Sequence, residues 1–362
     1  SVHIISRHER KVLTNSSCIC NIKSITNVRQ YRRGDMMKRT IAVAMLALLV
    51  IAGALFLMIR SGGAGEHTEE KAGSSAGTEI ERKPVVIETV NMDPDLRGIY
   101  SEAGIVVRLS DGKAITGFQE EERIYPASLT KMMTCLIGIE LIEDLSEEVT
   151  LEKEIFPPLY EEGASMAGFL PGETVTAEDL LYGIILPSGG ECSVQIARHT
   201  AGSEGAFVEL MNEKASELGM ENTHFANVTG LHDEEHYTTV EDMAALLRYA
   251  LKDRTFRTIF CTEKYTASPT EEHPEGLTFQ SSMFRLREDW KVPGGEVRGG
   301  KTGFTDQSGL CLASLAHVDN RDYIIVTAKA DGNHQTEPYH VLDALNLYGQ
   351  LRKEWGGSDT GV

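Results

Sequence analysis

The sequence predicts an α+β fold in which helices pack against an antiparallel sheet. Two runs rich in β-branched and apolar residues, 103–109 and 114–118, indicate strands near the start of the folded region, and two more, 310–317 and 323–330, indicate strands near its end. The segments between them show helical periodicity and helix start signals. Strands that open and close a helical middle are typical of this class.

Short polar connections join each pair of strands and predict two hairpins. Residues 110–113 contain an Asp-Gly pair, which hairpin turns favour. Residues 319–322 connect the second pair. Pro338 follows and is expected to open a last helix that ends near Lys353, because proline is tolerated in a first helical turn.

Four helices are expected in the middle of the chain. The run Ser128–Ile142 is apolar on nearly every side, which indicates a buried central helix. The other three carry capping residues at one or both ends. They are 180–186 after Thr176-x-x-Asp179, 203–218 closed by Gly219, and 239–252 opened by Thr239-x-x-Asp242.

The charge of the chain, −19 in total, is distributed unevenly. Residues 1–60 hold ten Lys and Arg against two Asp and Glu, which leaves 25 basic and 52 acidic residues in 61–362. So acidic a body repels phosphate groups, and we therefore expect no nucleic-acid partner.

The run 41–59 is apolar, contains no charge and predicts a membrane segment. A helix of this length crosses roughly 30 Å of hydrocarbon. The basic cluster before it predicts that the chain beyond Arg60 lies on the extracytoplasmic face. A cleaved signal peptide with its site at 62–64, which would secrete the protein, is the alternative, but the length of the run favours an uncleaved anchor.

These patterns divide the chain into parts. Met36-Met37-Lys38-Arg39 resembles the start of an exported protein, so we expect residues 1–35 to be translated upstream sequence rather than part of the mature protein. The remaining parts are 36–60, the signal anchor or signal peptide; 61–84, a flexible linker rich in Gly, Ser, Ala and Glu; 85–355, the folded domain; and 356–362, a tail.

Metal-binding residue types are scattered rather than clustered. His232 and His236 have a compatible spacing only on a helix, and their segment has the composition of a loop with no third ligand evident. The four cysteines beyond residue 61 show no paired spacing, and buried free thiols are favoured over disulfides. We expect no metal and no cofactor.

The strongest chemical signal is Ser128-Leu129-Thr130-Lys131 at the start of the central helix. Residues three apart share a helix face, so Ser128 and Lys131 are expected to be neighbours. A lysine whose pKa is lowered by burial or by another cation can accept the proton of a serine hydroxyl and make it a nucleophile. The pattern alone is weak, but an unpaired lysine is costly to bury, which favours a functional role.

Two further motifs strengthen this interpretation. Ser188-Gly189-Gly190 comes 60 residues after Ser128, and Lys301-Thr302-Gly303 comes 113 residues after Ser188. Each motif alone is typical of a plain turn or a strand edge. All three in this order and spacing would be a rare coincidence.

Around these motifs the chain resembles the serine D-alanyl-D-alanine carboxypeptidases, the low-molecular-weight penicillin-binding proteins of peptidase family S11. The resemblance extends from about Val85 to Trp355. It implies a serine β-lactamase/DD-peptidase-like fold with a helical subdomain and an active site between this subdomain and the sheet. The matching stretches are 125–134, 179–183, 211–212, 230–232, 301–305 and 309–312.

The resemblance implies a catalytic role for three residues. Ser128 would attack the carbonyl of the penultimate D-alanine of a peptidoglycan stem peptide, and Lys131 would take its proton. Ser188 would relay a proton towards the leaving amine. Water would then hydrolyse the acyl-enzyme, and β-lactam antibiotics would inhibit the enzyme at the same serine.

The third motif would bind substrate. Lys301 and Thr302 would hold the terminal carboxylate, Gly303 and Phe304 would also contact substrate, and Lys301 would keep Lys131 neutral. Backbone N–H groups of Ser128 and Phe304 would form the oxyanion hole, where one donor is worth roughly 2.7–4 kcal/mol.

One substrate-binding position departs from the family pattern. The third residue of the second motif is usually Asn, and here it is Gly190. The neighbouring Glu191 cannot replace the amide, because an ionised carboxylate only accepts hydrogen bonds. A sensor that binds penicillin or peptidoglycan without turnover therefore remains open. A serine β-lactamase also remains open, although no Glu-x-x-Leu-Asn-like segment lies between Ser188 and Lys301.

Overall fold

The computed structural model describes Ile87 and residues 93–355. The predicted parts 1–35, 36–60, 61–84 and 356–362, and with them the apolar run 41–59, lie outside these residues. Among the described residues, no helix is both long enough and apolar enough to span a membrane.

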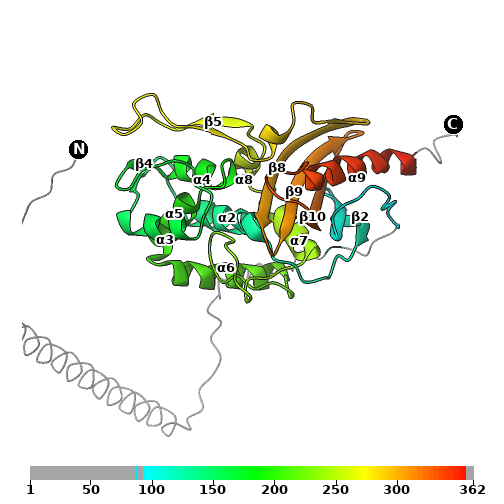
Figure 1. Cartoon of the computed structure of the whole chain (residues 1–362), viewed down its shortest axis with the longest axis horizontal. Coiled ribbons are helices and arrows are strands. Elements are labelled where there is room, and N and C mark those ends of the chain that lie inside the picture. Colours follow the sequence, from blue (N-terminus) through cyan, green and yellow to red (C-terminus); the bar gives the residue numbers. More distant parts are fainter. Residues whose placement is uncertain (1–86, 88–92, 356–362) are drawn as a thin grey trace, which may run out of the picture. The chain divides into compact units, whose positions relative to one another are not determined.

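The α+β prediction is confirmed. Within the described residues, six antiparallel strands form the central sheet in the order β2-β1-β10-β9-β8-β7 (Figure 1). Both predicted hairpins are present, and β1 pairs with β10, so that the two ends of the folded region lie side by side. The strands are β1 (Ala103–Arg108), β2 (Lys113–Phe118), β7 (Lys291–Val292), β8 (Gly295–Thr305), β9 (Gly309–Val318) and β10 (Arg321–Ala330).

The sheet is buried on both faces, as the alternation along β10 illustrates. Ile324 and Val326 face a core that contains the helices of the middle segment, whereas Tyr323 and Ile325 face a second core that includes Leu347 of the last helix. That helix, α9 (Tyr339–Trp355), packs against β9 and β10 (Figure 1). Residues that alternate along a strand point to opposite faces, which accounts for the two cores.

The predicted helices are present with small shifts at their ends. The central helix α2 (Lys131–Leu141) is buried over most of its length, and Ser128 precedes it in the 3-10 turn η1 (Ala127–Thr130). Thr176 and Asp179 form the expected capping box. The other helices are α3 (Phe156–Glu161), α4 (Ala177–Ile185), α5 (Gly190–Ala201), α6 (Glu204–Leu218), α7 (Val240–Ala250) and α8 (Arg254–Phe260).

Strand β8 was not predicted, because its sequence interrupts the apolar pattern with two glycines. Gly299 and Gly300 both lie within the paired strand. A Cβ at Gly299 would lie 2.6 Å from the carbonyl oxygen of Phe260, and one at Gly300 would overlap the Met283 sulfur. These glycines therefore allow close packing inside a strand.

The four cysteines among the described residues are free thiols. Cys135, Cys192 and Cys311 are buried, and Cys261 is half-buried.

Smaller elements complete the described part. The short elements are the strand pairs β3 (Glu148–Thr150) with β4 (Thr174–Thr176) and β5 (Lys264–Thr266) with β6 (Thr278–Gln280), and the 3-10 turns η2 (Lys153–Ile155) and η3 (Phe284–Leu286).

Candidate active site

The nucleophile candidate lies in a tight turn pressed against strand β8. Ala127, just before Ser128, has a φ of +46°, which is unusual for a residue with a side chain and costs about 1–3 kcal/mol. A Cβ at Gly303 of β8 would lie 3.2 Å from the backbone nitrogen of Ser128. The close approach brings the half-buried Ser128 to the edge of β8 that carries Thr302 and Gly303.

Lys131 lies one turn further along and contacts the Ser128 hydroxyl. Its Nζ is 3.1 Å from Ser128 Oγ and 2.6 Å from the carbonyl oxygen of Thr229. The side chain is only 2% exposed, and burial lowers the pKa of Lys131 to about 8, against the opposing effect of the Glu191 carboxylate. About a tenth of Lys131 is thus neutral at pH 7 and able to accept a proton, far more than at the usual pKa of lysine.

A second serine–lysine pair joins the second and third motifs. Lys301 Nζ donates to Ser188 Oγ at 2.8 Å and to the Thr302 carbonyl oxygen at 2.9 Å. Burial, followed by the positive charge of Lys131, keeps the pKa of Lys301 well below its usual range. Ser188 has a φ of +68°, another uncommon backbone conformation. Burial is also the main cause of the lowered pKa of Lys131, whereas the resemblance implied an effect of Lys301.

The two pairs lie at a cavity of about 490 Å³. The lining includes Ser128, Ser188, Thr302, Gly303 and Phe304 from the predicted set. Lys131 and Lys301 are buried behind their serines and do not line it. Among the described residues the lining contains no carboxylate. Its other members are Ser165, Pro187, Ser282, Arg285, Leu286, Leu310, Asn333, His334, Thr336, Pro338 and His340.

Several of these lining residues were not predicted from the sequence. Arg285 in η3 presents an exposed guanidinium to the cavity, and His334 packs edge-on against Phe304 with ring centroids 4.8 Å apart. Thr302 Oγ1 donates to Ser282 Oγ at 2.7 Å. A single basic or polar residue in a polar segment carries no pattern, so only the fold reveals that these residues meet.

Gly190 is not among the residues that line the cavity. It begins α5, and its backbone N–H donates to the Ser165 carbonyl oxygen at 2.7 Å. A Cβ there would lie 3.2 Å from both Ala164 Cβ and Leu159 Cδ2, so the segment around Ala164 already occupies the space of a side chain. The prediction that residue 190 contacts substrate therefore has no support in the cavity lining.

Glu191 is fully buried beside this segment. Its Oε1 accepts from the backbone N–H groups of Ala167 and Gly168 at 2.7 and 2.8 Å. Burial raises the pKa of the Glu191 carboxyl, while these two bonds act in the opposite direction. Glu191 therefore holds the segment that crowds Gly190.

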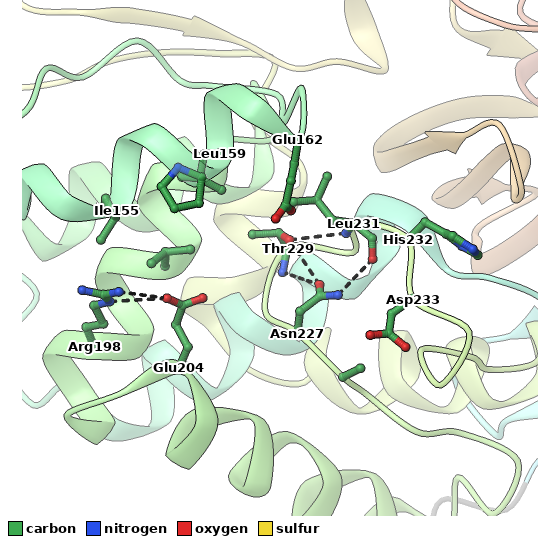
Figure 2. A pocket seen from close by; sticks show the side chains of 13 residues that line it. Ile155, Leu159, Glu162, Arg198, Glu204, Asn227, Thr229, Leu231, His232 and Asp233 are labelled. Carbon is green, nitrogen blue, oxygen red and sulfur yellow. Dashed lines mark hydrogen bonds and ion pairs between the residues drawn. The ribbon is translucent and has the colours of Figure 1, made fainter.

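A second cavity, also about 490 Å³, is lined in part by the segment that contains Thr229 (Figure 2). It is lined by charged groups that include the ion pair of Arg198 and Glu204, at 3.2 Å. Asn227 and Thr229 also line it, and Figure 2 shows the Asn227 amide bonded to the backbone around it. In the part of the chain that the structure describes, no group of three or more His, Cys, Asp or Glu could hold a metal ion.

Comparisons with known proteins agree on one family. A family profile described as D-alanyl-D-alanine carboxypeptidase matches residues 88–332. The chain is 34% identical over 235 residues to the D-alanyl-D-alanine carboxypeptidase DacF of Bacillus subtilis, covering 62% of this chain and 56% of that protein. It is 32% identical over 234 residues to DacA of Escherichia coli, covering 62% and 55%. The chain thus spans about half the length of these relatives.

Solved structures show a similar fold. The Streptomyces K15 DD-transpeptidase superposes with a TM-score of 0.62 and 25% identity, covering 72% of this chain and all of that one. A D-alanyl-D-alanine carboxypeptidase from Mycobacterium tuberculosis has a TM-score of 0.62 at 22% identity, covering 75% of this chain and 96% of that one, which is a likeness of fold.

Substitutions at Gly190 test whether its surroundings are as crowded as the geometry indicates. Gly190→Ala and Gly190→Asn are each expected to lower the free energy of unfolding by roughly 1–3 kcal/mol, because a side chain must displace Ala164 or Leu159. Urea unfolding measures this change. Gly205→Ala is the matched control: Gly205 lies in the first turn of a helix with nothing within 4 Å of an added Cβ. Equal stability of all three variants would show that the 164–165 segment yields freely.

Proposed function

The chain belongs to the D-alanyl-D-alanine carboxypeptidase family, and we propose that it is a serine-type enzyme that removes the terminal D-alanine from peptidoglycan stem peptides through an acyl-enzyme. The observation that carries this proposal is the Ser128–Lys131 pair, with its 3.1 Å separation and buried amine, at the wall of a cavity. A neutral amine beside a serine hydroxyl is what nucleophilic attack at neutral pH requires.

In the first step, Ser128 Oγ bonds to the carbonyl carbon of the penultimate D-alanine as its proton passes to Lys131 Nζ. Backbone N–H groups of Ser128 and Phe304 are proposed to hold the oxyanion. The C–N bond then breaks, and the leaving D-alanine takes a proton by way of Ser188. Lys301, which donates to Ser188 Oγ, orients that hydroxyl.

Two residues of the cavity lining suit the anionic end of such a peptide. Arg285 and Thr302 both line it, and they supply a cation and a hydroxyl for a terminal carboxylate. The fully buried Lys301 is proposed to act on the substrate through Ser188, whose hydroxyl it orients, rather than by direct contact. Water then attacks the ester carbonyl and frees Ser128.

The composition of the cavity lining favours the peptidase over the β-lactamase alternative. Rapid release needs a group that activates water, and the described lining contains no carboxylate. β-Lactams are therefore proposed to act as inhibitors. One solved relative is named a DD-transpeptidase, so an amine could also accept the acyl group.

We also propose that the enzyme works on the extracytoplasmic face of the bacterial membrane, anchored by residues 41–59. The support is the uncharged length of this run and the basic cluster before it. A variant without residues 1–60 should leave the membrane fraction and keep its penicillin labelling, because all three motifs follow residue 60. If the penicillin-labelled variant still sedimented with the membranes, the proposal that residues 41–59 anchor the protein would be contradicted.

The nucleophile is tested by Ser128→Ala. This change should abolish both labelling by a fluorescent penicillin and D-alanine release from a D-Ala-D-Ala peptide, because it removes the hydroxyl that lies beside the proton acceptor Lys131 and is proposed to carry the acyl group. Ser216→Ala, on an exposed face of α6, is the control and should retain both. Labelling that survives Ser128→Ala rejects the assignment. For the unaltered chain, fast release of the bound penicillin would identify a β-lactamase. Labelling by penicillin without any release of D-alanine from the peptide would identify a sensor.

The acylation rate should depend on pH through Lys131. Its folded-state pKa of about 8 lies below the usual value for lysine, and only the neutral amine accepts the Ser128 proton. The second-order rate constant for penicillin acylation should therefore fall about tenfold for each pH unit below about 8 and level off above it. A profile that is flat between about pH 6 and 9 would show that another group is the base.

A further inference from the structure

The Lys131 amine is held by two contacts, and only one of them belongs to the nucleophile. Its Nζ lies 2.6 Å from the Thr229 carbonyl oxygen and 3.1 Å from Ser128 Oγ. A neutral amine has two hydrogens and one lone pair, and a carbonyl accepts only a hydrogen. A hydrogen directed to Thr229 leaves the lone pair available to the Ser128 hydroxyl. The position of the Thr229 carbonyl therefore determines the direction in which the lone pair of Lys131 Nζ points.

One side chain fixes the turn that carries the Thr229 carbonyl. Asn227 Oδ1 accepts from the backbone N–H of Thr229 at 3.1 Å, and Asn227 Nδ2 donates to the Leu231 carbonyl oxygen at 2.9 Å (Figure 2). The same Oδ1 also accepts from the backbone N–H of Gly230 at 2.7 Å. Three backbone groups of one short turn thus depend on a single amide. Loss of the amide would leave two N–H groups and a carbonyl of a largely buried turn without these partners.

The same turn is anchored to the nucleophile on both sides. Gly230 has a φ of +81°, and a Cβ there would overlap the Ala127 carbonyl oxygen, directly before Ser128. Ala226, just before the turn, donates its backbone N–H to His236 Nδ1 at 2.9 Å. The other ring nitrogen of His236, Nε2, lies 2.7 Å from Thr130 Oγ1, next to Lys131. Small movements of the turn are consequently passed to the Ser128–Lys131 pair.

We propose that Asn227 is a positioning residue for the proton acceptor Lys131, acting through the turn 227–231 and the Thr229 carbonyl. This inference rests on the proposed acyl-transfer function. Asn227 does not line the substrate cavity; it lines the neighbouring cavity of Figure 2 and contacts no reacting atom. Its effect should therefore appear in the rate of bond formation and not in the binding of substrate.

The experiment measures penicillin acylation of the full chain at several penicillin concentrations, which separates the binding constant from the maximal acylation rate. Asn227→Ala should lower the maximal rate by about 10- to 100-fold, the size of effect expected when a catalytic group is misplaced by about 1 Å. The binding constant should stay within about twofold, because the cavity lining is unchanged.

Asn212→Ala provides a matched control. Asn212 is also half-buried, and it makes the same kinds of bonds, accepting from the Phe225 backbone N–H at 2.8 Å and donating to the Phe225 carbonyl oxygen at 2.8 Å. It anchors the same segment upstream of the turn, so it should lower stability while leaving the acylation rate within about twofold. Thermal unfolding of both variants is measured in parallel.

The outcomes are distinct. A maximal rate that is unchanged in Asn227→Ala, or one that falls equally in both variants, overturns the positioning role. If Asn227→Ala does not fold, Asn227→Asp replaces it. This variant keeps the acceptor for Thr229 and Gly230 but sets an oxygen against the Leu231 carbonyl oxygen in place of the N–H donor, so it should displace the turn and lower the maximal rate. A maximal rate equal to that of the unaltered chain overturns the proposal. Failure of the unaltered chain to acylate would instead reject the proposed function.

Discussion

The burial of two lysine amines beside two serine hydroxyls is the constraint on which the site depends. A charged ammonium is costly to bury, so burial lowers the pKa of both Lys131 and Lys301. Each amine has a serine within hydrogen-bond distance, at 3.1 and 2.8 Å. The same exclusion of water that makes Lys131 a base also makes its carbonyl partner necessary, because a buried N–H without an acceptor is unfavourable. Electrostatics and hydrogen bonding thus require the same packed surroundings.

Those surroundings are assembled from distant parts of the chain, and their closeness explains the local backbone. Strand β8 approaches the turn before α2 so tightly that even a Cβ at Gly303 would lie only 3.1 Å from the Pro126 carbonyl oxygen. Ala127 and Ser188 adopt positive φ values of +46° and +68° at the two serine-bearing turns. Strained conformations persist only where the surroundings determine them, and here they orient the hydroxyls of the two pairs.

The sequence was sufficient for those features that depend on local pattern. The Asp-Gly hairpin, the Thr176 and Thr239 caps and the left-handed Gly219 terminus are each set by residues within a few positions of one another. Strand β8 escaped prediction because Gly299 and Gly300 serve packing against distant atoms. Arg285 escaped for the same kind of reason, since its place in the cavity depends on elements far away in sequence. The motif serines and lysines were found because chemistry restricts their types.

Gly190 illustrates how a position can change its role while the motif around it persists. Ser188 keeps its bond to Lys301, but the space beside residue 190 is filled by Ala164 and Leu159. Glu191 fixes that filling through two backbone N–H groups, at the expense of a buried carboxylate oxygen that has no hydrogen-bond partner among the described residues. A glycine without this support would leave a void or a mobile segment beside the base. Gly190 and Glu191 therefore act as one structural unit. The segment that Glu191 holds fills the space beside Gly190, but the hydrogen bonds of an Asn amide at residue 190 are not replaced.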